Sequence, residues 1–180
     1  MRIVLMGGSL RPESLNTRYL GHLDRELQGM GHGTEVHGGA ALRWPLYEDG
    51  LPVPEGVLAS AEALRGASGL VIVSPEYNAG IPGHLKNAVD WLSVQKPSPW
   101  TGLPVLLAAC SPGAFGGARA LLSWRATLAN MGAVVLPQAL TIPHADQALD
   151  PTGRPVEARS AETTRRTLEA FATFCEKLAR

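Results

Sequence analysis

The chain has 180 residues, a length that fits one domain or at most two small ones. Sixteen basic and sixteen acidic residues balance and are scattered, so the basic patch that nucleic acids and membrane surfaces attract is missing. Two separated cysteines, and five histidines without metal-ligand spacing, argue against a disulfide framework and a metal site. With no long apolar run and no signal-peptide pattern, we expect a cytoplasmic protein without a membrane partner.

The first part of the chain predicts two strands and two helices by apolar periodicity. Residues 2–6 read as a strand that ends at a Gly-Gly pair, and apolar residues then recur at helical spacing over 15–30. A short, weakly marked strand is expected at 34–37. After an irregular stretch over 38–54, residues 57–64 suggest the second helix.

Three more strands and three more helices follow. The strands are expected at residues 69–74, 104–110 and 133–136, and the first two are continuous apolar runs. Such runs are typical of strands that are buried on both faces of a parallel sheet. The helices are expected from Pro82 or Gly83 to residue 92, over 117–131 and over 161–178, with a polar segment at 143–155 before the last.

Five strands alternating with five helices predict an α/β fold with helices on both faces of a parallel sheet. At this length the flavodoxin-like strand order 2-1-3-4-5 fits best, and we expect residues 1–180 to form a single domain. Ligands of such sheets bind beyond the carboxyl ends of the strands, at the point where the strand order reverses. That rule directs attention to three loops, residues 7–16, 75–83 and 111–117.

The first loop carries hydroxyls, an amide and an arginine ahead of a helix N-terminus. It contains neither GxGxxG nor GxxxxGK[ST], which argues against a dinucleotide fingerprint and a P-loop. Ser9, Arg11, Ser14 and Asn16 together would suit a phosphate monoester. The structural alternative is that Ser14 only caps the helix and Ser9 only makes a turn.

The other two loops suit a flat ligand. An aromatic side chain, an amide and several backbone groups follow one another over residues 75–83, which indicates a heteroaromatic ligand with polar edges. Three glycines over 111–117 would allow backbone N–H groups to approach it, although a tight turn explains them equally well. For Lys86 and Asp90 we favour a surface ion pair over catalysis. The residues alone therefore predict a phosphorylated aromatic cofactor and go no further.

Several motifs resemble those of the NADPH-dependent FMN reductase family, which includes chromate and quinone reductases. They are Gly-Ser-Leu-Arg at 8–11 with Ser14 and Asn16, Pro-Glu-Tyr-Asn at 75–78 running into Leu-Lys-Asn-Ala-Val-Asp-Trp at 85–91, Gly-Gly-Ala-Arg at 116–119 and Pro-Leu-Tyr at 45–47. The resemblance covers essentially the whole chain. One departure is Arg43-Trp44, which precedes Pro-Leu-Tyr where a plainer apolar pair is commoner.

The resemblance implies a flavodoxin-like fold with non-covalently bound FMN. The phosphate would be held by Ser9, Arg11, Ser14, Leu15 and Asn16, the isoalloxazine would be lined by Pro75, Glu76, Tyr77 and Asn78, and Ser111 and Gly113 would lie near its pyrimidine edge. Hydride would pass from NADPH or NADH to the flavin N5, and then electrons to a small-molecule acceptor. The acceptor would be a quinone, chromate, a nitro or azo compound, or free flavin.

The family also implies a homodimer or homotetramer and, since the cofactor carries the difficult step, no obligatory side-chain acid or base. Three alternatives stay open at this point. In the first, FMN is a released substrate rather than a prosthetic group. In the second, the protein is a flavodoxin-like electron carrier, and in the third it is an interaction protein that binds no flavin. A carrier typically docks through a strongly acidic face, and the zero net charge argues against one.

Overall fold

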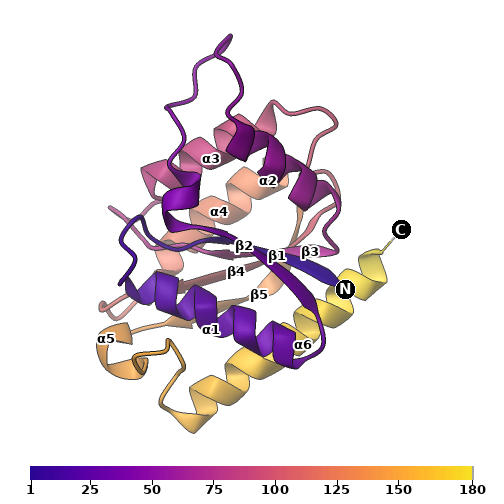
Figure 1. The fold of residues 1–180 in the computed structure, drawn as a ribbon. Coiled ribbons are helices and arrows are strands. Elements are labelled where there is room, and N and C mark those ends of the chain that lie inside the picture. The colour runs from indigo at the N-terminus through magenta and orange to yellow at the C-terminus, as the bar shows by residue number, and fades with distance from the viewer. Residues whose placement is uncertain (180) are drawn as a thin grey trace.

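A computed structural model describes residues 1–179 and contains one five-stranded parallel sheet. The strands are β1 (Arg2–Gly7), β2 (Gly33–Gly38), β3 (Gly69–Val73), β4 (Pro104–Cys110) and β5 (Val134–Ile142). Their order is β2-β1-β3-β4-β5, so the predicted flavodoxin-like order is confirmed (Figure 1). Gly7 pairs with Gly38 on one side and Val73 on the other, which places the carboxyl ends of these strands at one edge.

Helices cover both faces of the sheet, as the sequence predicted. One face is covered by α2 (Glu55–Arg65), α3 (Gly83–Ser93) and α4 (Ala118–Asn130), and the other by α1 (Leu15–Gly29) and α6 (Ala158–Leu178) (Figure 1). Every residue of β3 and β4 is buried, which explains their continuous apolar runs. Within residues 1–179, no helix is long and apolar enough to cross a membrane.

The last strand is longer than the sequence predicted. It was expected at residues 133–136, but β5 starts at Val134 and continues through Pro137 to Ile142. The strand lies at the edge of the sheet, where a residue without an N–H costs no ladder hydrogen bond on its open side. Its register with β4 shifts between Val105 and Leu107, near the same point.

Two segments that were expected to be irregular contain short helices. The stretch 38–54 begins with the 3-10 helix η1 (Gly39–Leu42), and the polar segment 143–155 contains α5 (Ala145–Ala148). Four-residue helices bury too few residues to produce a periodic apolar pattern, so the sequence carries no signal for them.

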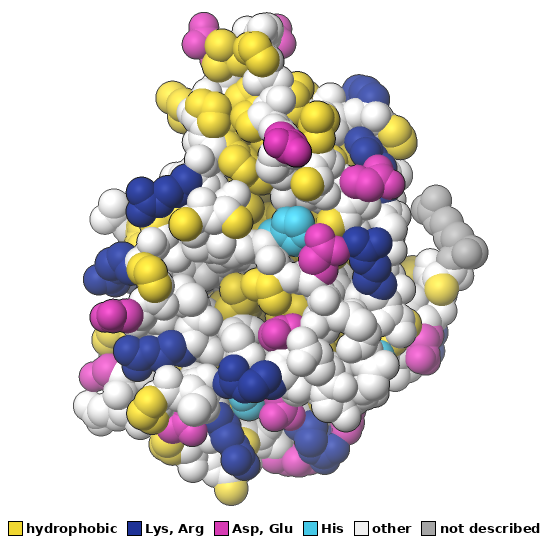
Figure 2. Space-filling model, viewed as in Figure 1, with side chains coloured by type: hydrophobic (Ala, Val, Ile, Leu, Met, Phe, Trp, Pro, Cys, Tyr) yellow, Lys and Arg dark blue, Asp and Glu magenta, His cyan; other side chains and the backbone are white. Residues whose placement is uncertain are grey.

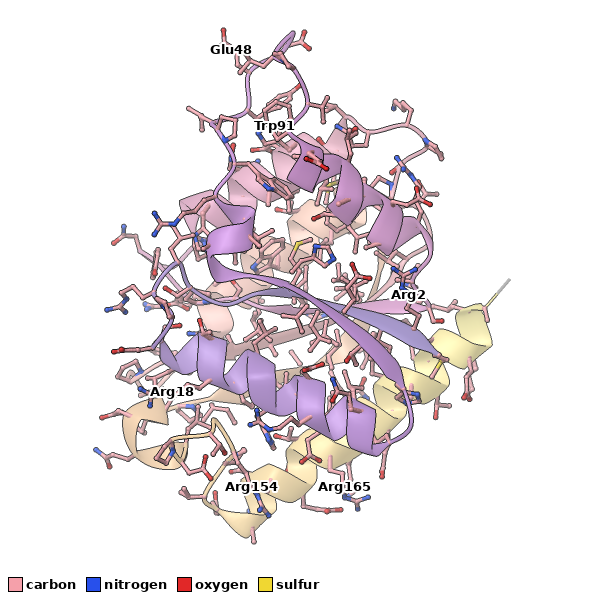
Figure 3. The ribbon with its side chains drawn as sticks, in the orientation of Figure 1. Arg2, Arg18, Glu48, Trp91, Arg154 and Arg165 are labelled. Carbon is pink, nitrogen blue, oxygen red and sulfur yellow. The ribbon has the colours of Figure 1, made fainter. Side chains whose placement is uncertain are left out.

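The connection from η1 to α2 projects beyond α3 and is fastened to it. Asn87 donates a hydrogen bond to the Pro45 carbonyl at 3.0 Å and accepts one from the Tyr47 N–H at 2.8 Å. The Trp91 indole donates to the same Pro45 carbonyl at 2.7 Å, and its ring meets Tyr47 edge to face at 5.1 Å. Figure 3 shows Trp91 beneath the projecting loop that carries Glu48. Trp91 therefore packs against the connection between η1 and α2.

Candidate functional site

Three loops meet beyond the carboxyl ends of β1, β3 and β4 and line a cavity of about 720 Å³. This volume lies within the range of small-molecule and cofactor sites, roughly 300–1,000 Å³. It occurs at the point where the strand order reverses, as expected. Among the predicted site residues, the lining includes Ser9, Arg11, Ser14, Leu15, Asn16, Pro75, Glu76, Tyr77 and Ser111, whereas Asn78 and Gly113 are not part of it.

The serines of the first loop organise the backbone around them. The Arg11 N–H donates to the Ser9 hydroxyl at 3.2 Å, which closes a turn, and the Ser9 hydroxyl also shares a 3.3 Å hydrogen bond with the Tyr77 hydroxyl. Ser14 is the N-cap of α1, and its hydroxyl accepts the Thr17 N–H at 3.0 Å. The turn and cap interpretations of these serines are therefore confirmed, and a ligand role for them would come in addition.

Arg11 differs from the serines because its side chain is exposed to the cavity. Within residues 1–179, its guanidinium engages no carboxylate and no carbonyl. A free guanidinium beside the exposed N–H groups at the start of α1 is a donor set that suits a phosphate.

Asn16 joins the start of α1 to the end of β4. Its amide nitrogen donates to the Cys110 carbonyl at 2.8 Å, and its amide oxygen accepts the Cys110 N–H at 3.1 Å. The side chain is buried, and these bonds leave it one N–H for a ligand. The sequence predicted that Asn16 contacts a ligand. The contact that the structure shows is the pair of hydrogen bonds with the Cys110 backbone.

The second loop contains a tight turn next to the cavity. Tyr77 and Gly80 exchange backbone hydrogen bonds of 3.2 and 3.0 Å, and the two residues between them, Asn78 and Ala79, have φ angles of 51° and 61°. Two positive φ angles define a type I′ turn, which asparagine tolerates well. Alanine does not, so the turn holds Ala79 in a strained backbone conformation. The turn also explains why Asn78 is not part of the cavity lining.

Glu76 connects the second loop to helix α4. Its carboxylate accepts the N–H groups of Arg119 and Ala120 at 3.0 and 3.2 Å, and the Arg119 side chain donates to it at 2.7 Å. The side chain is only 8% exposed. Burial raises the pKa of Glu76, but the hydrogen bonds from Arg119 and Ala120 outweigh it, so the pKa is held below its ordinary value. The carboxylate is therefore charged and neutralised from α4, rather than free to face a ligand.

The third loop is a tight turn between β4 and α4. Gly117 has a φ of 87°, and a Cβ placed there would lie 2.6 Å from the Cβ of Ala109, so only glycine fits. The Ser111 hydroxyl donates to the Gly113 carbonyl at 3.3 Å. This geometry supports the turn interpretation of the glycines, while Ser111 itself lines the cavity.

Sequence reasoning missed two charged residues of the cavity, Glu13 of the first loop and Arg43. Arg43 is the more informative of the two. It comes from the connection between η1 and α2, which the sequence identified only as irregular. The sequence showed that Arg43-Trp44 departs from the family pattern. No local pattern, however, indicates that this segment lies beside the loops that follow β1 and β3. The other lining residues that were not predicted are Leu10, Pro12, Cys110 and Pro112.

The histidine at the start of α3 lies near Arg43. Burial lowers the pKa of His84, the Gly8 backbone opposes this effect, and the charge of Arg43 adds to the lowering. Its Nε2 atom is buried and has no hydrogen-bond partner among residues 1–179. Farther along α3, Lys86 donates to Asp90 at 2.5 Å, which is the surface pair that the sequence favoured.

Taken as chemistry, the cavity combines phosphate donors with an aromatic side chain. Arg11 and the start of α1 supply the donors, and Tyr77 of the second loop supplies the aromatic ring. This arrangement fits the phosphorylated planar ligand that the residues predicted.

Comparisons with known proteins agree with this chemistry. Residues 1–147 match the family model described as NADPH-dependent FMN reductase. A quinone reductase of Escherichia coli K12 is 35% identical over 186 residues, which cover 99% of this chain and 97% of the relative. An NAD(P)H-dependent FMN reductase of Pseudomonas aeruginosa is 31% identical with the same coverage. A solved flavoenzyme NAD(P)H:(acceptor) oxidoreductase from Paracoccus denitrificans has a TM-score of 0.83 at 28% identity and covers 98% of this chain and 97% of that one.

Proposed function

This chain belongs to the NADPH-dependent FMN reductase family, and on that premise we propose that it binds FMN and reduces a quinone with electrons from NAD(P)H. The observation that carries the proposal is the free guanidinium of Arg11 at the α1 N-terminus, in one cavity with Tyr77 of the 77–80 turn. A ligand that joins a phosphate to a flat ring system needs both features in one site.

The FMN phosphate would be held by Arg11, the Ser9 hydroxyl and the backbone N–H groups of Leu15 and Asn16. The Ser14 N–H already donates to the Arg11 carbonyl and its hydroxyl caps α1, so Ser14 would act by holding the loop in place. Asn16 would add its remaining amide N–H. The ring would lie against Pro75, Glu76, Tyr77 and Asn78, with Ser111 and Gly113 at its pyrimidine edge. Of these, Asn78 would act through the turn it forms.

When bound, FMN would supply the redox chemistry, which is the acceptance of hydride from NAD(P)H and the delivery of electrons to the acceptor. The protein's part is orientation and electrostatics. Glu76, neutralised by Arg119 and by the start of α4, adds no free negative charge beside the ring. The Tyr77 N–H already donates to the Gly80 carbonyl, so the backbone N–H groups of Glu76 and Asn78, with those near Gly113, would stabilise negative charge there as preorganised dipoles. We therefore assign no side chain as acid or base.

Quinone is the acceptor we propose, because a relative named a quinone reductase aligns over almost the whole chain. The alternative acceptors are chromate, nitro and azo compounds and free flavin. The same assay compares their rates of reduction with that of a quinone. Two free, buried cysteines accord with a reducing compartment, and we propose the cytoplasm.

We also propose that the protein acts as a homodimer or homotetramer. Large apolar side chains are exposed on helices and loops, among them Leu46, Leu122 and Phe115. Figure 2 shows hydrophobic side chains gathered where the connection between η1 and α2 projects. Such a patch marks an interface, and a second copy of this chain is the occupant that the family suggests.

An absorption spectrum followed by anaerobic addition of NADPH tests the function. We expect a bound-flavin spectrum that bleaches, and parallel double-reciprocal lines with a quinone. A flavin that stays oxidised contradicts the reductase proposal and favours an electron carrier, whereas a colourless protein that takes up no FMN contradicts both. FMN that dissociates on gel filtration identifies a released substrate.

The site assignment is tested with Arg11→Ala. We expect the Kd of FMN to rise about 10-fold or more, since a charge-assisted hydrogen bond contributes about 1.5–3 kcal/mol. The control is Arg18→Ala, which removes an exposed arginine of α1 that does not line the cavity (Figure 3). FMN affinity that is equal in the two variants rejects Arg11 as the phosphate ligand.

A further inference from the structure

The cavity contains two arginines. Arg11 comes from the loop after β1, whereas Arg43 comes from the segment after η1. Within residues 1–179, neither guanidinium forms a hydrogen bond or an ion pair, in contrast to Arg2, Arg65 and Arg119, which bind carboxylates. Two free guanidiniums from different segments offer sites for two anionic groups in one cavity.

The backbone on both sides of Arg43 is firmly held. Leu42, directly before it, is 1% exposed in the hydrophobic core, and the Arg43 N–H donates to the Ala40 carbonyl at 3.1 Å. Pro45, two residues after it, accepts hydrogen bonds from both Asn87 and Trp91 of α3. The guanidinium therefore extends from a rigid backbone, which lowers the entropic cost of binding a ligand.

Arg43 and Arg11 enter the cavity from different segments of the chain. Arg11 lies in the turn closed by the Ser9 hydroxyl, just before the start of α1. Arg43 follows η1, outside the three loops that carry the predicted ligand residues. Because the FMN phosphate is assigned to Arg11 and the start of α1, an anion at Arg43 would belong to another molecule.

The acidic residues of the lining do not cancel this charge. Glu76 is already neutralised by Arg119 and by two N–H groups of α4. Glu13 is exposed in the first loop and, among residues 1–179, forms no ion pair with either arginine. Arg43 therefore remains as a cation available to an incoming ligand.

We propose that Arg43 is an anion subsite for the second substrate, where it binds a negatively charged group of the molecule that exchanges electrons with FMN. This inference rests on the proposed function. The shared chemistry is an oxyanion on a small molecule: either a phosphate of the pyridine nucleotide or an acidic substituent of the acceptor. Arg43 is thereby a residue that determines which donor or acceptor is preferred.

The test compares Arg43→Ala and Arg43→Lys with Arg18→Ala as the matched control. Calorimetry measures the affinity for NADP⁺ and for a sulfonated quinone, neither of which requires turnover. Steady-state kinetics give the KM of NADPH, of NADH and of the neutral parent quinone. We expect Arg43→Ala to weaken one anionic ligand about tenfold, Arg43→Lys to restore most of the affinity, and Arg18→Ala to change nothing.

The two sources of the anion give different results. If the donor phosphate binds Arg43, NADP⁺ affinity falls, the KM of NADPH rises and both quinones are unaffected. If the acceptor binds there, only the sulfonated quinone loses affinity. The proposal is overturned if neither ligand changes by more than about twofold, or if FMN affinity falls as much as in Arg11→Ala.

Failure of the proposed function gives a separate result. Wild-type protein that binds no FMN, or whose FMN is not reduced by NADPH, contradicts the reductase proposal before any variant is compared. In that case the calorimetric comparison of wild type with Arg43→Ala still decides whether Arg43 binds an anion.

Discussion

Polar side chains around the cavity have two kinds of role. Ser9, Ser14 and Asn16 bind nearby backbone groups and thereby shape the loops, whereas Arg11 and Arg43 remain free. A sequence shows that such residues cluster, but the same hydroxyl serves as a helix cap or as a ligand. Only the positions of neighbouring N–H and C=O groups distinguish the two roles.

Ala79 provides a prediction at this scale. Its φ of 61° is a left-handed conformation that costs a non-glycine residue about 1–2 kcal/mol. Glycine relieves this strain but gives the unfolded chain more freedom, so we expect Ala79→Gly to raise the free energy of unfolding by about 0.5–1 kcal/mol. Urea denaturation measures it.

Ala114→Gly is the control, because Ala114 is an exposed loop residue without a positive φ. It gains no relief of strain and is expected to lower the stability slightly. Equal effects of the two substitutions would show that the turn at residues 77–80 is not strained.

At the scale of elements, two side chains fasten the loops of the site to the fold. Asn16 joins α1 to β4 through the Cys110 backbone, and Glu76 joins the loop after β3 to α4. The partners in the first contact are 94 residues apart in the chain, and those in the second 43 and 44. The Pro-Glu-Tyr-Asn motif therefore identified Glu76 as a site residue but not its contact with α4. No spacing along the chain indicates that a side chain binds the N–H groups at the start of a distant helix.

The contact of Glu76 with α4 predicts a pH-dependent stability. Because its pKa is depressed in the folded state, Glu76 stabilises the protein above its ordinary pKa of 4.5, and this stabilisation is lost as the pH falls through the folded-state pKa. We expect Glu76→Gln to lower the free energy of unfolding by about 1–2 kcal/mol at neutral pH. The difference from wild type should narrow as the pH falls below 4.5.

Denaturant titrations of both proteins at several pH values measure this difference. Glu62→Gln is the matched control, because Glu62 forms an exposed pair with Arg65 on α2 that contributes little. A Glu76→Gln effect that is independent of pH, or no larger than that of Glu62→Gln, contradicts the role assigned to the carboxylate.

At the scale of the whole molecule, the fold brings the loops after β1, β3 and β4 to one edge and leaves apolar side chains exposed elsewhere. The connection between η1 and α2 presents Leu46, which is 81% exposed, although its backbone is fastened to α3. A rigid segment that exposes leucine to water is suited to contact another protein surface.

Leu46→Glu tests whether that surface pairs two copies of this chain. We expect the dissociation constant of the oligomer to rise at least about tenfold, because a buried carboxylate without a partner is costly. Sedimentation equilibrium measures it. Val156→Glu, at a residue that is 62% exposed before α6, is expected to leave the oligomer intact. A wild-type monomer would contradict the oligomer proposal itself.

The sequence alone determined the alternation of strands and helices, the strand order and the three loops of the site, because apolar runs and glycine-rich turns are local signals and the handedness of crossovers restricts the topology. It also identified the family through Pro-Glu-Tyr-Asn and the first loop. The tertiary structure decided which polar side chains are free. In it, β5 continues through Pro137, and Asn16 and Glu76 form hydrogen bonds with backbone groups far away in the chain. Arg43 lines the cavity. Each of these depends on contacts between segments far apart in the chain, and the spacing of residues along one chain carries no record of such contacts.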